Sequence, residues 1–266
     1  MPRTRANSRR RANRSPKEVT LAAVRANGLQ LVLAHHSLKN DKKVVLAAVR
    51  QNGMALAYAS GRLMNDRDVV LAAVRQDGLA LQVTSSHMRS DRSIVLAAVR
   101  RDGTALAYAS GNLKDDRDLV LSAVRQNGFA LHSASAHMKS DMEVVLSAVR
   151  QNGVAITFAA DNLKHKSDFV LEAMHQNGLA LEHALHYQMD DKNVVLAAVR
   201  QDGLALEHAS GRLQNDKDVV LAAVRQNRSA LEFASGIRQT DISTVRAAMG
   251  TTMPSRYRTP RGRWSQ

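Results

Sequence analysis

Residues 41–65 read DKKVVLAAVRQNGMALAYASGRLMN, and residues 66–90 read DRDVVLAAVRQDGLALQVTSSHMRS. The pattern returns every 25 residues without an insertion, in nine units from residue 16 to 240 and a truncated tenth from 241 to 250. An internal repeat of this length indicates a repeat protein, in which each unit packs against its neighbours. A leucine column marks the period at Leu21, Leu46, Leu71, Leu96, Leu121, Leu146, Leu171, Leu196 and Leu221.

Each unit is predicted to contain two short helices. Asp41 is a good N-cap for the first helix, because its carboxylate accepts hydrogen bonds from the free amides of the first turn. This helix runs through VVLAAVRQ and ends at Asn52 and Gly53, where glycine is expected to adopt the left-handed conformation of a C-cap. A second helix follows, because apolar side chains such as Leu56 and Leu63 fall on one stripe of a helical wheel. Strands are excluded, since ALAYAS and LAAVRQ are rich in alanine and leucine and lack β-branched alternation.

A column of alanine in the second helix indicates that neighbouring units pack closely, because a larger side chain would push their helices apart. The first helix is apolar nearly all round its middle, so we expect it to be sandwiched between its counterparts. The sequence therefore predicts an all-α fold, a right- or left-handed α-solenoid of about nine two-helix repeats of 25 residues. It is expected to span residues 16–249, between disordered basic tails at residues 1–15 and 250–266. The alanine column is Ala55, Ala80, Ala105, Ala130, Ala155, Ala180, Ala205 and Ala230.

The consensus D-x-x-V-V-L-x-A-V-R-Q-N-G-x-A-L-x-x-A-S-x-x-L resembles the repeat of the DUF4116 family, a family of domains of unknown function. The resemblance covers residues 17–249 and is specific, because Gln-Asn-Gly or Gln-Asp-Gly followed by Ala-Leu recurs at a fixed spacing. It implies tandem helical repeats and carries no catalytic or binding residue to transfer. The seventh unit departs from the pattern at Lys166 in the cap column, at His175 in the arginine column and at Gln188, where leucine or methionine is expected.

The positive charge is concentrated at the two ends of the chain. The formal net charge is +14, from 38 basic and 24 acidic residues. Ten basic residues lie in residues 1–14 and 249–266, which contain no acid, so the body between them is close to neutral. Such tails are typical of nuclear-localisation or nucleic-acid-contacting segments, with a plain solvated tail and an organelle-targeting peptide as alternatives. The tail arginines are Arg3, Arg5, Arg9, Arg10, Arg11, Arg14, Arg256, Arg258, Arg261 and Arg263.

The composition favours an intracellular protein, either cytoplasmic or nuclear. Cysteine is absent from the sequence, which excludes disulfides and thiolate metal sites. The longest apolar runs, such as VVLAAV, are too short for a transmembrane helix or for the core of a signal peptide. We therefore expect neither a signal peptide nor a transmembrane segment, and no membrane partner.

The most regular polar feature of the repeat is a column of arginine at the end of the first helix. One interpretation is a ladder that binds anions. The other is that each guanidinium caps helix carbonyls, meets the negative end of the helix or pairs with a neighbouring acid. The column consists of Arg25, Arg50, Arg75, Arg100, Arg125, Arg150, Arg200 and Arg225.

The sequence contains no recognisable motif of an enzyme. It lacks a P-loop, a dinucleotide fingerprint, an H-E-x-x-H motif and a nucleophile elbow.

Histidines cluster at His183 and His186, but units stand about 10 Å apart, too far for two units to share a zinc ion bound at about 2.0 Å. Reading one base per repeat is disfavoured by Glu182, Glu207 and Glu232 in successive units, because they repel a phosphate backbone. We expect no enzymatic activity, no cofactor and no bound metal.

These observations favour a non-enzymatic helical-repeat scaffold that binds an unidentified protein partner along its extended surface. The alternatives are a nucleic-acid-associated protein that uses its arginine-rich tails, and a structural spacer without a specific partner. A monomer is expected. Candidate partner-binding residues lie where the repeat is broken or where a variable column is aromatic, at Tyr58, Tyr108, Phe158, His165, Lys166, His175, His183, His186 and Tyr187.

Overall fold

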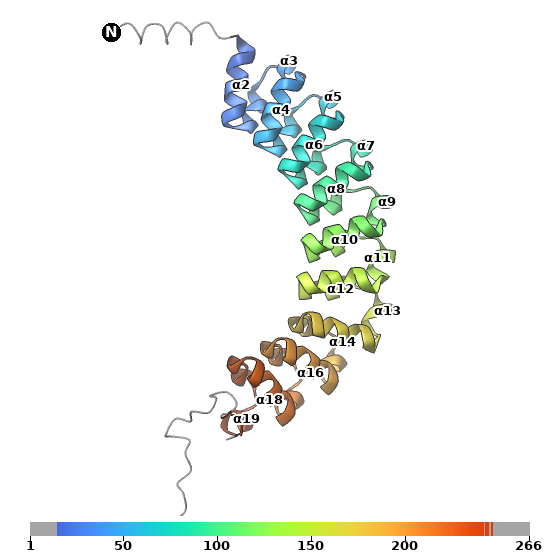
Figure 1. The fold of residues 1–266 in the computed structure, drawn as a ribbon, viewed down its shortest axis with the longest axis vertical. Coiled ribbons are helices and arrows are strands. Elements are labelled where there is room, and N and C mark those ends of the chain that lie inside the picture. Colours follow the sequence, from blue (N-terminus) through green and yellow to red (C-terminus); the bar gives the residue numbers. More distant parts are fainter. Residues whose placement is uncertain (1–14, 242, 245, 247–266) are drawn as a thin grey trace, which may run out of the picture. The chain divides into compact units, whose positions relative to one another are not determined.

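Helices make up the whole of the described fold. The computed structural model describes residues 15–241, 243, 244 and 246, and every secondary-structure element among them is helical. Within these residues, a long α-helix, a 3₁₀-helix and a short α-helix follow one another in nine repeats (Figure 1). The predicted all-α fold of tandem helical repeats is therefore confirmed. The basic tails expected at residues 1–15 and 250–266 lie outside the described residues, except for Ser15.

Each repeat begins with its long α-helix, called here the A helix. The A helices are α2 (Pro16–Ala26), α4 (Lys42–Gln51), α6 (Arg67–Gln76), α8 (Arg92–Arg101), α10 (Arg117–Gln126), α12 (Met142–Gln151), α14 (Ser167–Gln176), α16 (Lys192–Gln201) and α18 (Lys217–Gln226). The 3₁₀-helices are η1 (Gly28–Leu33), η2 (Gly53–Tyr58), η3 (Gly78–Val83), η4 (Gly103–Tyr108), η5 (Gly128–Ser133), η6 (Gly153–Phe158), η7 (Gly178–His183), η8 (Gly203–His208) and η9 (Arg228–Phe233). The short α-helices are α3 (His36–Lys39), α5 (Gly61–Met64), α7 (Ser86–Arg89), α9 (Gly111–Lys114), α11 (Ala136–Ser140), α13 (Asp161–Lys164), α15 (His186–Met189), α17 (Gly211–Gln214) and α19 (Gly236–Thr240).

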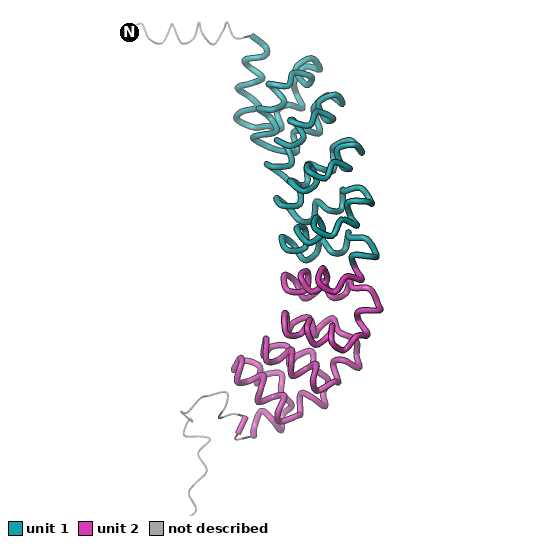
Figure 2. Tube along the Cα trace, turned by 45° about the vertical axis from the view of Figure 1, so that its right-hand side comes forward, with its two compact units in different colours: residues 1–138 teal, residues 139–266 magenta. Residues whose placement is uncertain are grey.

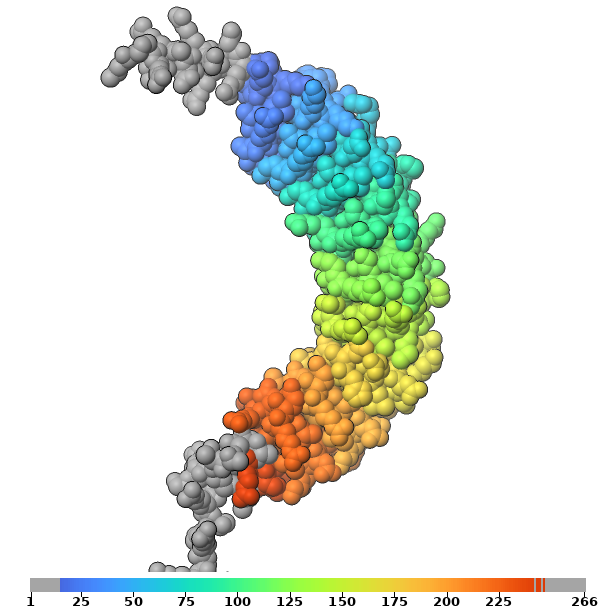
Figure 3. Space-filling model, viewed as in Figure 1, coloured from blue at the N-terminus to red at the C-terminus, as the bar shows by residue number. Residues whose placement is uncertain are grey.

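The chain divides into two compact units, residues 1–138 and 139–266 (Figure 2). In the first unit, consecutive A helices from α2 to α10 pack side by side, and so do the 3₁₀-helices from η1 to η5. In the second unit, α12 to α18 and η6 to η9 form the same two layers. The surface of each unit consequently follows the order of the sequence, which Figure 3 shows as successive bands of colour.

The apolar core lies between the A helices and the 3₁₀-helices. Val45, Ala48 and Val49 of α4 and Leu56 of η2 have no exposed surface, and the same columns are buried in the third to eighth repeats. The alanine column of the 3₁₀-helices is also buried throughout, which confirms the close packing expected from it. No helix in the described part of the chain combines the length and the apolar character needed to cross a membrane.

Aspartate starts most of the A helices, as the sequence predicts. The Oδ1 atom of Asp41 accepts hydrogen bonds from the backbone N–H groups of Lys43, at 2.9 Å, and Val44, at 3.3 Å. These bonds satisfy two of the amides that have no partner inside the helix. The exceptions are α2, which Ser15 caps, and α14, where Lys166 occupies the cap position and makes no capping hydrogen bond through its side chain.

The glycine that follows the first eight A helices has a different role from the predicted one, and Arg228 takes its place after α18. Asn52 ends α4 in an extended conformation, and Gly53 does not adopt the left-handed conformation expected of a C-cap glycine. A Cβ atom on Gly53 would instead lie 2.6 Å from the carbonyl oxygen of Ala73 and 2.8 Å from the Cβ of Asp77. The prediction of a left-handed cap was therefore wrong: glycine is required because the backbone of the next repeat passes too close for any side chain.

A glutamine at the end of the A helix joins neighbouring repeats at five junctions, through Gln51, Gln76, Gln126, Gln201 and Gln226. Oε1 of Gln226 accepts a hydrogen bond of 2.6 Å from the N–H of Gly203, and its Nε2 donates one of 3.1 Å to the carbonyl of Gln201. Arg101 occupies the glutamine position in the fourth repeat and donates to the Gln76 carbonyl at 3.2 Å. A guanidinium has no acceptor atom, so Arg101 replaces only half of the glutamine contact.

The second helical segment of the repeat is divided, whereas one continuous helix was expected. Ala59 ends η2 in an extended conformation, and Ser60 caps α5. The N–H of Ser60 donates a hydrogen bond of 2.9 Å to the carbonyl of Lys39 in the preceding repeat. The helix is interrupted here because this N–H bonds to the neighbouring repeat instead of to its own helix.

Candidate functional site

The arginine column lies on the surface, at the last turn of the A helices. All eight guanidinium-bearing residues are exposed. Arg150 donates a hydrogen bond of 2.7 Å from Nε to Oε1 of Gln176. The other seven form no hydrogen bond or ion pair with any described residue, although each lies at the end of the A helix that favours a cation. No carbonyl cap or acid pair is seen for these seven in the described part of the chain, while their place in the last turn agrees with the remaining part of that interpretation, a cation at the negative end of the helix.

These arginines border a series of hollows between consecutive A helices of the first unit. A hollow of about 570 Å³ between α2 and α4 is lined by Leu21, Arg25, Leu46 and Arg50. The next hollow, of about 680 Å³, shares Leu46 and Arg50, and a third of about 550 Å³ continues over α6 and α8. Because neighbouring hollows share a leucine and an arginine, they join into one surface. We call it the arginine trough, defined by Leu21, Leu46, Leu71, Leu96, Arg25, Arg50, Arg75 and Arg100.

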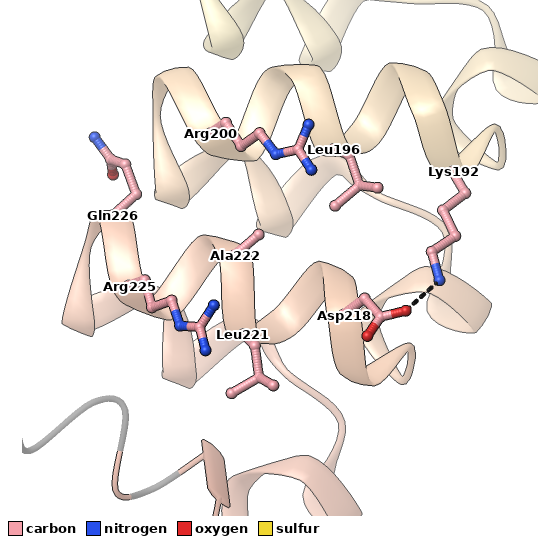
Figure 4. Close-up of a pocket in the computed structure, with 8 residues that line it drawn as sticks. All are labelled: Lys192, Leu196, Arg200, Asp218, Leu221, Ala222, Arg225 and Gln226. Carbon is pink, nitrogen blue, oxygen red and sulfur yellow. Dashed lines mark hydrogen bonds and ion pairs between the residues drawn. The ribbon is translucent and has the colours of Figure 1, made fainter.

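The second unit repeats this arrangement on α16 and α18. A hollow of about 780 Å³ is lined by Leu196 and Arg200 from α16 and by Leu221 and Arg225 from α18. Figure 4 shows both guanidinium groups extending the same way along their helices, beside the leucine side chains. The surface therefore combines apolar side chains with cations that are available to an outside partner.

A second regular feature is a ladder of ion pairs at the opposite end of the A helices. A lysine or arginine in the first turn of an A helix contacts the capping aspartate of the next repeat, as Lys192 contacts Asp216 at 2.9 Å. The hydrogen bond from Arg92 lowers the pKa of Asp116 against the opposing effect of partial burial. We call this set the ion-pair ladder, formed by Lys17–Asp41, Lys42–Asp66, Arg67–Asp91, Arg92–Asp116 and Lys192–Asp216.

The aromatic candidates of the variable column stay apart from one another. Tyr58 is 37% exposed at the end of η2, and Tyr108 is half-buried at the end of η4. Because η3 with Val83 packs between η2 and η4, the two rings do not form one site. Phe158 is half-buried at the end of η6, in the second unit.

His165 and Tyr187 are the two candidates that the structure brings together. Their rings are parallel within 7°, with centroids 6.2 Å apart, and His165 Nδ1 lies 3.0 Å from the Tyr187 hydroxyl. The buried Gln188 donates from Nε2 to the carbonyl of Lys164 at 2.7 Å and accepts at Oε1 from the N–H of Leu185 at 3.0 Å. Gln188 therefore bridges two backbone groups that bond directly in regular repeats, which explains its departure from leucine.

The remaining candidate residues of the seventh repeat lie apart from one another and do not form one site. Lys166 is exposed at the start of α14, and His175 is exposed in its last turn, within the arginine column. His183 lies 3.7 Å from Glu182 of its own helix, and His186 is exposed at the start of α15. Among the described residues, no group of three histidine, aspartate or glutamate side chains could hold a metal ion. The tail arginines proposed for nucleic-acid contact lie outside the described residues.

Sequence reasoning missed the residues that surround the His165–Tyr187 pair. A hollow of about 190 Å³ beside the pair is also lined by Ser167, Asp191 and Asn193. The signal was present in the sequence, because Ser167 interrupts a column that is lysine or arginine in most repeats. The serine could be interpreted only once the structure showed that the lysine or arginine of this column pairs with the capping aspartate of the next repeat.

Comparison with known proteins identifies the repeat but not an activity. The model of the family described as a domain of unknown function (DUF4116) matches residues 17–64, 43–89, 66–114, 91–139, 141–187 and 191–237. No curated protein and no solved structure matches the chain significantly. Because the matches cover most of the sequence in overlapping pairs of repeats, the chain belongs to the DUF4116 family.

Proposed function

We propose that the chain is a non-enzymatic helical-repeat scaffold that binds an acidic, extended segment of a protein partner along the arginine trough. One observation carries the proposal: the guanidinium groups of the trough are exposed and have no partner among the described residues. An arginine paired within its own repeat would first have to break that pair, whereas these are free to meet a carboxylate. Their regular spacing makes several such contacts available to one ligand.

The chemistry of the trough favours a peptide over a nucleic acid. Its floor is formed by half-exposed leucines such as Leu46 and Leu71, with alanine between them at Ala47 and Ala72. Apolar side chains of a peptide gain free energy by covering such a floor. A single-stranded nucleic acid relies on aromatic side chains that stack on its bases, and none of the residues lining the trough is aromatic.

The spacing of the repeats suits an extended chain. Packed helices stand about 8–10 Å apart, so consecutive arginines of the column are separated by about that distance. A polyproline II chain has three residues per turn and rises about 3.1 Å per residue, so every third side chain returns to one face after about 9 Å. An acidic residue at every third position would therefore meet successive arginines, while the residues between them reach the leucines.

The test uses a fluorescein-labelled peptide of four Glu-Leu-Pro repeats and the full chain, with fluorescence anisotropy at about 150 mM salt. The variant Arg50→Gln, Arg75→Gln, Arg100→Gln removes three cations from the trough. An exposed ion pair contributes about 0.2–1 kcal/mol, so losing three is expected to weaken binding about tenfold. The matched control removes the same charge from the short helices, through Arg62→Gln, Arg89→Gln and Lys114→Gln, and is expected to bind as the wild type does.

Three further results decide the alternatives. A peptide of four Gln-Leu-Pro repeats is expected to bind weakly, because it lacks the carboxylates. If oligouridine binds more tightly than the acidic peptide and the trough variant abolishes that binding, the trough is a nucleic-acid site and the proposal is wrong. If oligouridine binding disappears only when residues 1–14 and 250–266 are removed, the tails bind nucleic acid. Equal binding of the acidic peptide to wild type and trough variant contradicts the proposal and favours the spacer.

A further inference from the structure

The ion-pair ladder is interrupted in the seventh repeat. Ser167 occupies the first position of α14, where Lys42 or Lys192 would place an ammonium group on the next capping aspartate. Asp191 accepts hydrogen bonds from the backbone N–H groups of Asn193, at 2.8 Å, and Val194, at 3.3 Å. It forms no ion pair with any residue that the structure describes. Its carboxylate therefore keeps acceptor positions that a cation fills in five other repeats.

The space left by the shorter serine side chain is a hollow within the second unit. Its volume is about 190 Å³, below the range of about 300–1,000 Å³ that encloses a drug-sized ligand, so it suits a single side chain. His165 and Tyr187 provide a polar and aromatic wall, and Val170, Leu171 and Val194 provide apolar surface. The arrangement thus contains a carboxylate, an aromatic wall and an apolar floor in one small volume.

We infer that this hollow binds a lysine or arginine side chain of a partner protein, whose charged head pairs with Asp191 in the position that the ladder cations occupy elsewhere. The methylene groups of such a side chain would lie against Val170 and Val194. The face of the Tyr187 ring attracts a cation, and the rings of Tyr187 and His165 both offer surface to its alkyl stem. The Tyr187 hydroxyl is held 3.3 Å from Nε2 of the buried Gln188, so the aromatic wall is fixed before the ligand arrives.

Other occupants fit the hollow less well. An anion would face the carboxylate of Asp191, and a metal ion would find only one carboxylate among the lining residues. Lys166 is exposed, is not among the lining residues and forms no ion pair with Asp191, so the chain does not supply the cation from there. The inference does not depend on the proposed ligand of the arginine trough, which has the opposite charge and would meet arginines at the other end of the A helices.

The test is a titration of the ¹⁵N-labelled full chain with N-acetyl-lysine methylamide and N-acetyl-arginine methylamide, followed by amide chemical shifts. N-acetyl-norleucine methylamide is the uncharged control ligand. Binding is expected in the millimolar range, with the shifts centred on Asp191, Asn193 and Tyr187. Ser167→Lys restores the ladder and is expected to abolish binding, whereas Ser167→Ala leaves the hollow open and is expected to retain it.

A second variant tests the carboxylate itself. Asp191→Asn keeps a good N-cap for α16 and is expected to weaken the binding of both cationic ligands about two- to fivefold. If the variant does not fold, the comparison of Ser167→Lys with Ser167→Ala decides alone. The inference is wrong if norleucine binds as tightly as lysine, if Ser167→Lys binds as wild type does, or if neither cationic ligand shifts the amides around Asp191. The peptide assay of the trough does not affect these outcomes.

Discussion

The backbone N–H of Gly178 donates a hydrogen bond of 2.6 Å to Oε1 of Gln201, in the next repeat. Because Gly178 is buried, an N–H left without an acceptor there costs about 1–3 kcal/mol. Gln201→Met, which keeps the shape of the side chain and loses the acceptor, is expected to lower the free energy of unfolding by about that amount. Gln201→Glu keeps an acceptor and is expected to retain most of the stability. Urea denaturation followed by circular dichroism measures both variants.

The fourth repeat supplies the reverse experiment. Arg101→Gln gives the N–H of Gly78 the acceptor that a guanidinium lacks, and it is expected to raise the free energy of unfolding by about 0.5–1.5 kcal/mol. Equal stability of wild type, Gln201→Met and Arg101→Gln would show that the glutamine column does not hold the repeats together.

Gly53 and Gly61 form a matched pair for testing close backbone approach. A Cβ atom on Gly53 would meet the Ala73 carbonyl oxygen at 2.6 Å, whereas one on Gly61 would meet nothing within 4 Å. Gly53→Ala is therefore expected to lower the free energy of unfolding by about 1–3 kcal/mol. Gly61→Ala, in the first turn of a helix, is expected to be neutral or slightly stabilising. Thermal melts of both variants test the pair, and similar losses would contradict the packing argument.

Lys166→Asp is expected to stabilise the seventh repeat. The aspartate would accept hydrogen bonds at the start of α14 as Asp41 does for α4, which contributes about 0.5–2 kcal/mol. Lys166→Ala separates the gain of a cap from the loss of the lysine and is expected to change little. The melting temperatures of wild type, Lys166→Asp and Lys166→Ala test this. An equal rise in melting temperature in both variants would mean that the loss of lysine, and not the new cap, stabilises the repeat.

Acid is expected to weaken the ion-pair ladder at Asp116. The hydrogen bond from Arg92 holds the pKa of Asp116 below its usual value. Its contribution is therefore complete above the unfolded-state pKa of about 3.9 and is lost as the pH falls through the lower folded-state pKa. Asp116→Asn is expected to be less stable than wild type at neutral pH, with the difference shrinking as the pH falls below the unfolded-state pKa and through the lower folded-state pKa. Urea midpoints measured from pH 7 to about pH 2.5 test this, and a difference independent of pH would refute it.

Arg75 is expected to be dispensable for folding. Its guanidinium has no partner among the described residues, so Arg75→Gln should change the free energy of unfolding by less than about 0.5 kcal/mol. Arg92→Gln, which breaks the pair with Asp116 at 2.6 Å, is the comparison and is expected to lose more. A large loss of stability in Arg75→Gln would indicate that the arginine column contributes to the stability of the fold.

The sequence predicts the repeat because its period is visible residue by residue. Asp41 and Asn52 mark the ends of α4, and the capping bond of Asp41 needs only residues two and three positions away. Gly53 shows the limit of this reasoning. Its recurrence shows that glycine is required, but the reason is the Ala73 carbonyl of the next repeat, a tertiary contact that local pattern does not contain.

The sequence predicted some residues of the candidate sites and missed others. His165 and Tyr187 were identified because they break the pattern, and the structure brings them together. Ser167 and Asp191 were missed, because serine looks unremarkable until its column is known to reach the capping aspartate 24 residues later. The arginine column was identified with two interpretations open, and only the structure shows that its members other than Arg150 have no partner in the described chain.

The glutamine–glycine bond also bears on how the chain folds and how its length can change. It spans 23 residues, and the ion-pair ladder spans 24, so each joins only adjacent repeats. Contacts this local favour rapid folding that starts in one repeat and propagates to its neighbours. Insertion or deletion of one whole 25-residue repeat keeps the donors and acceptors of the remaining junctions in their present register. The number of arginines offered to a ligand can therefore change by gene duplication or loss without redesign of the core.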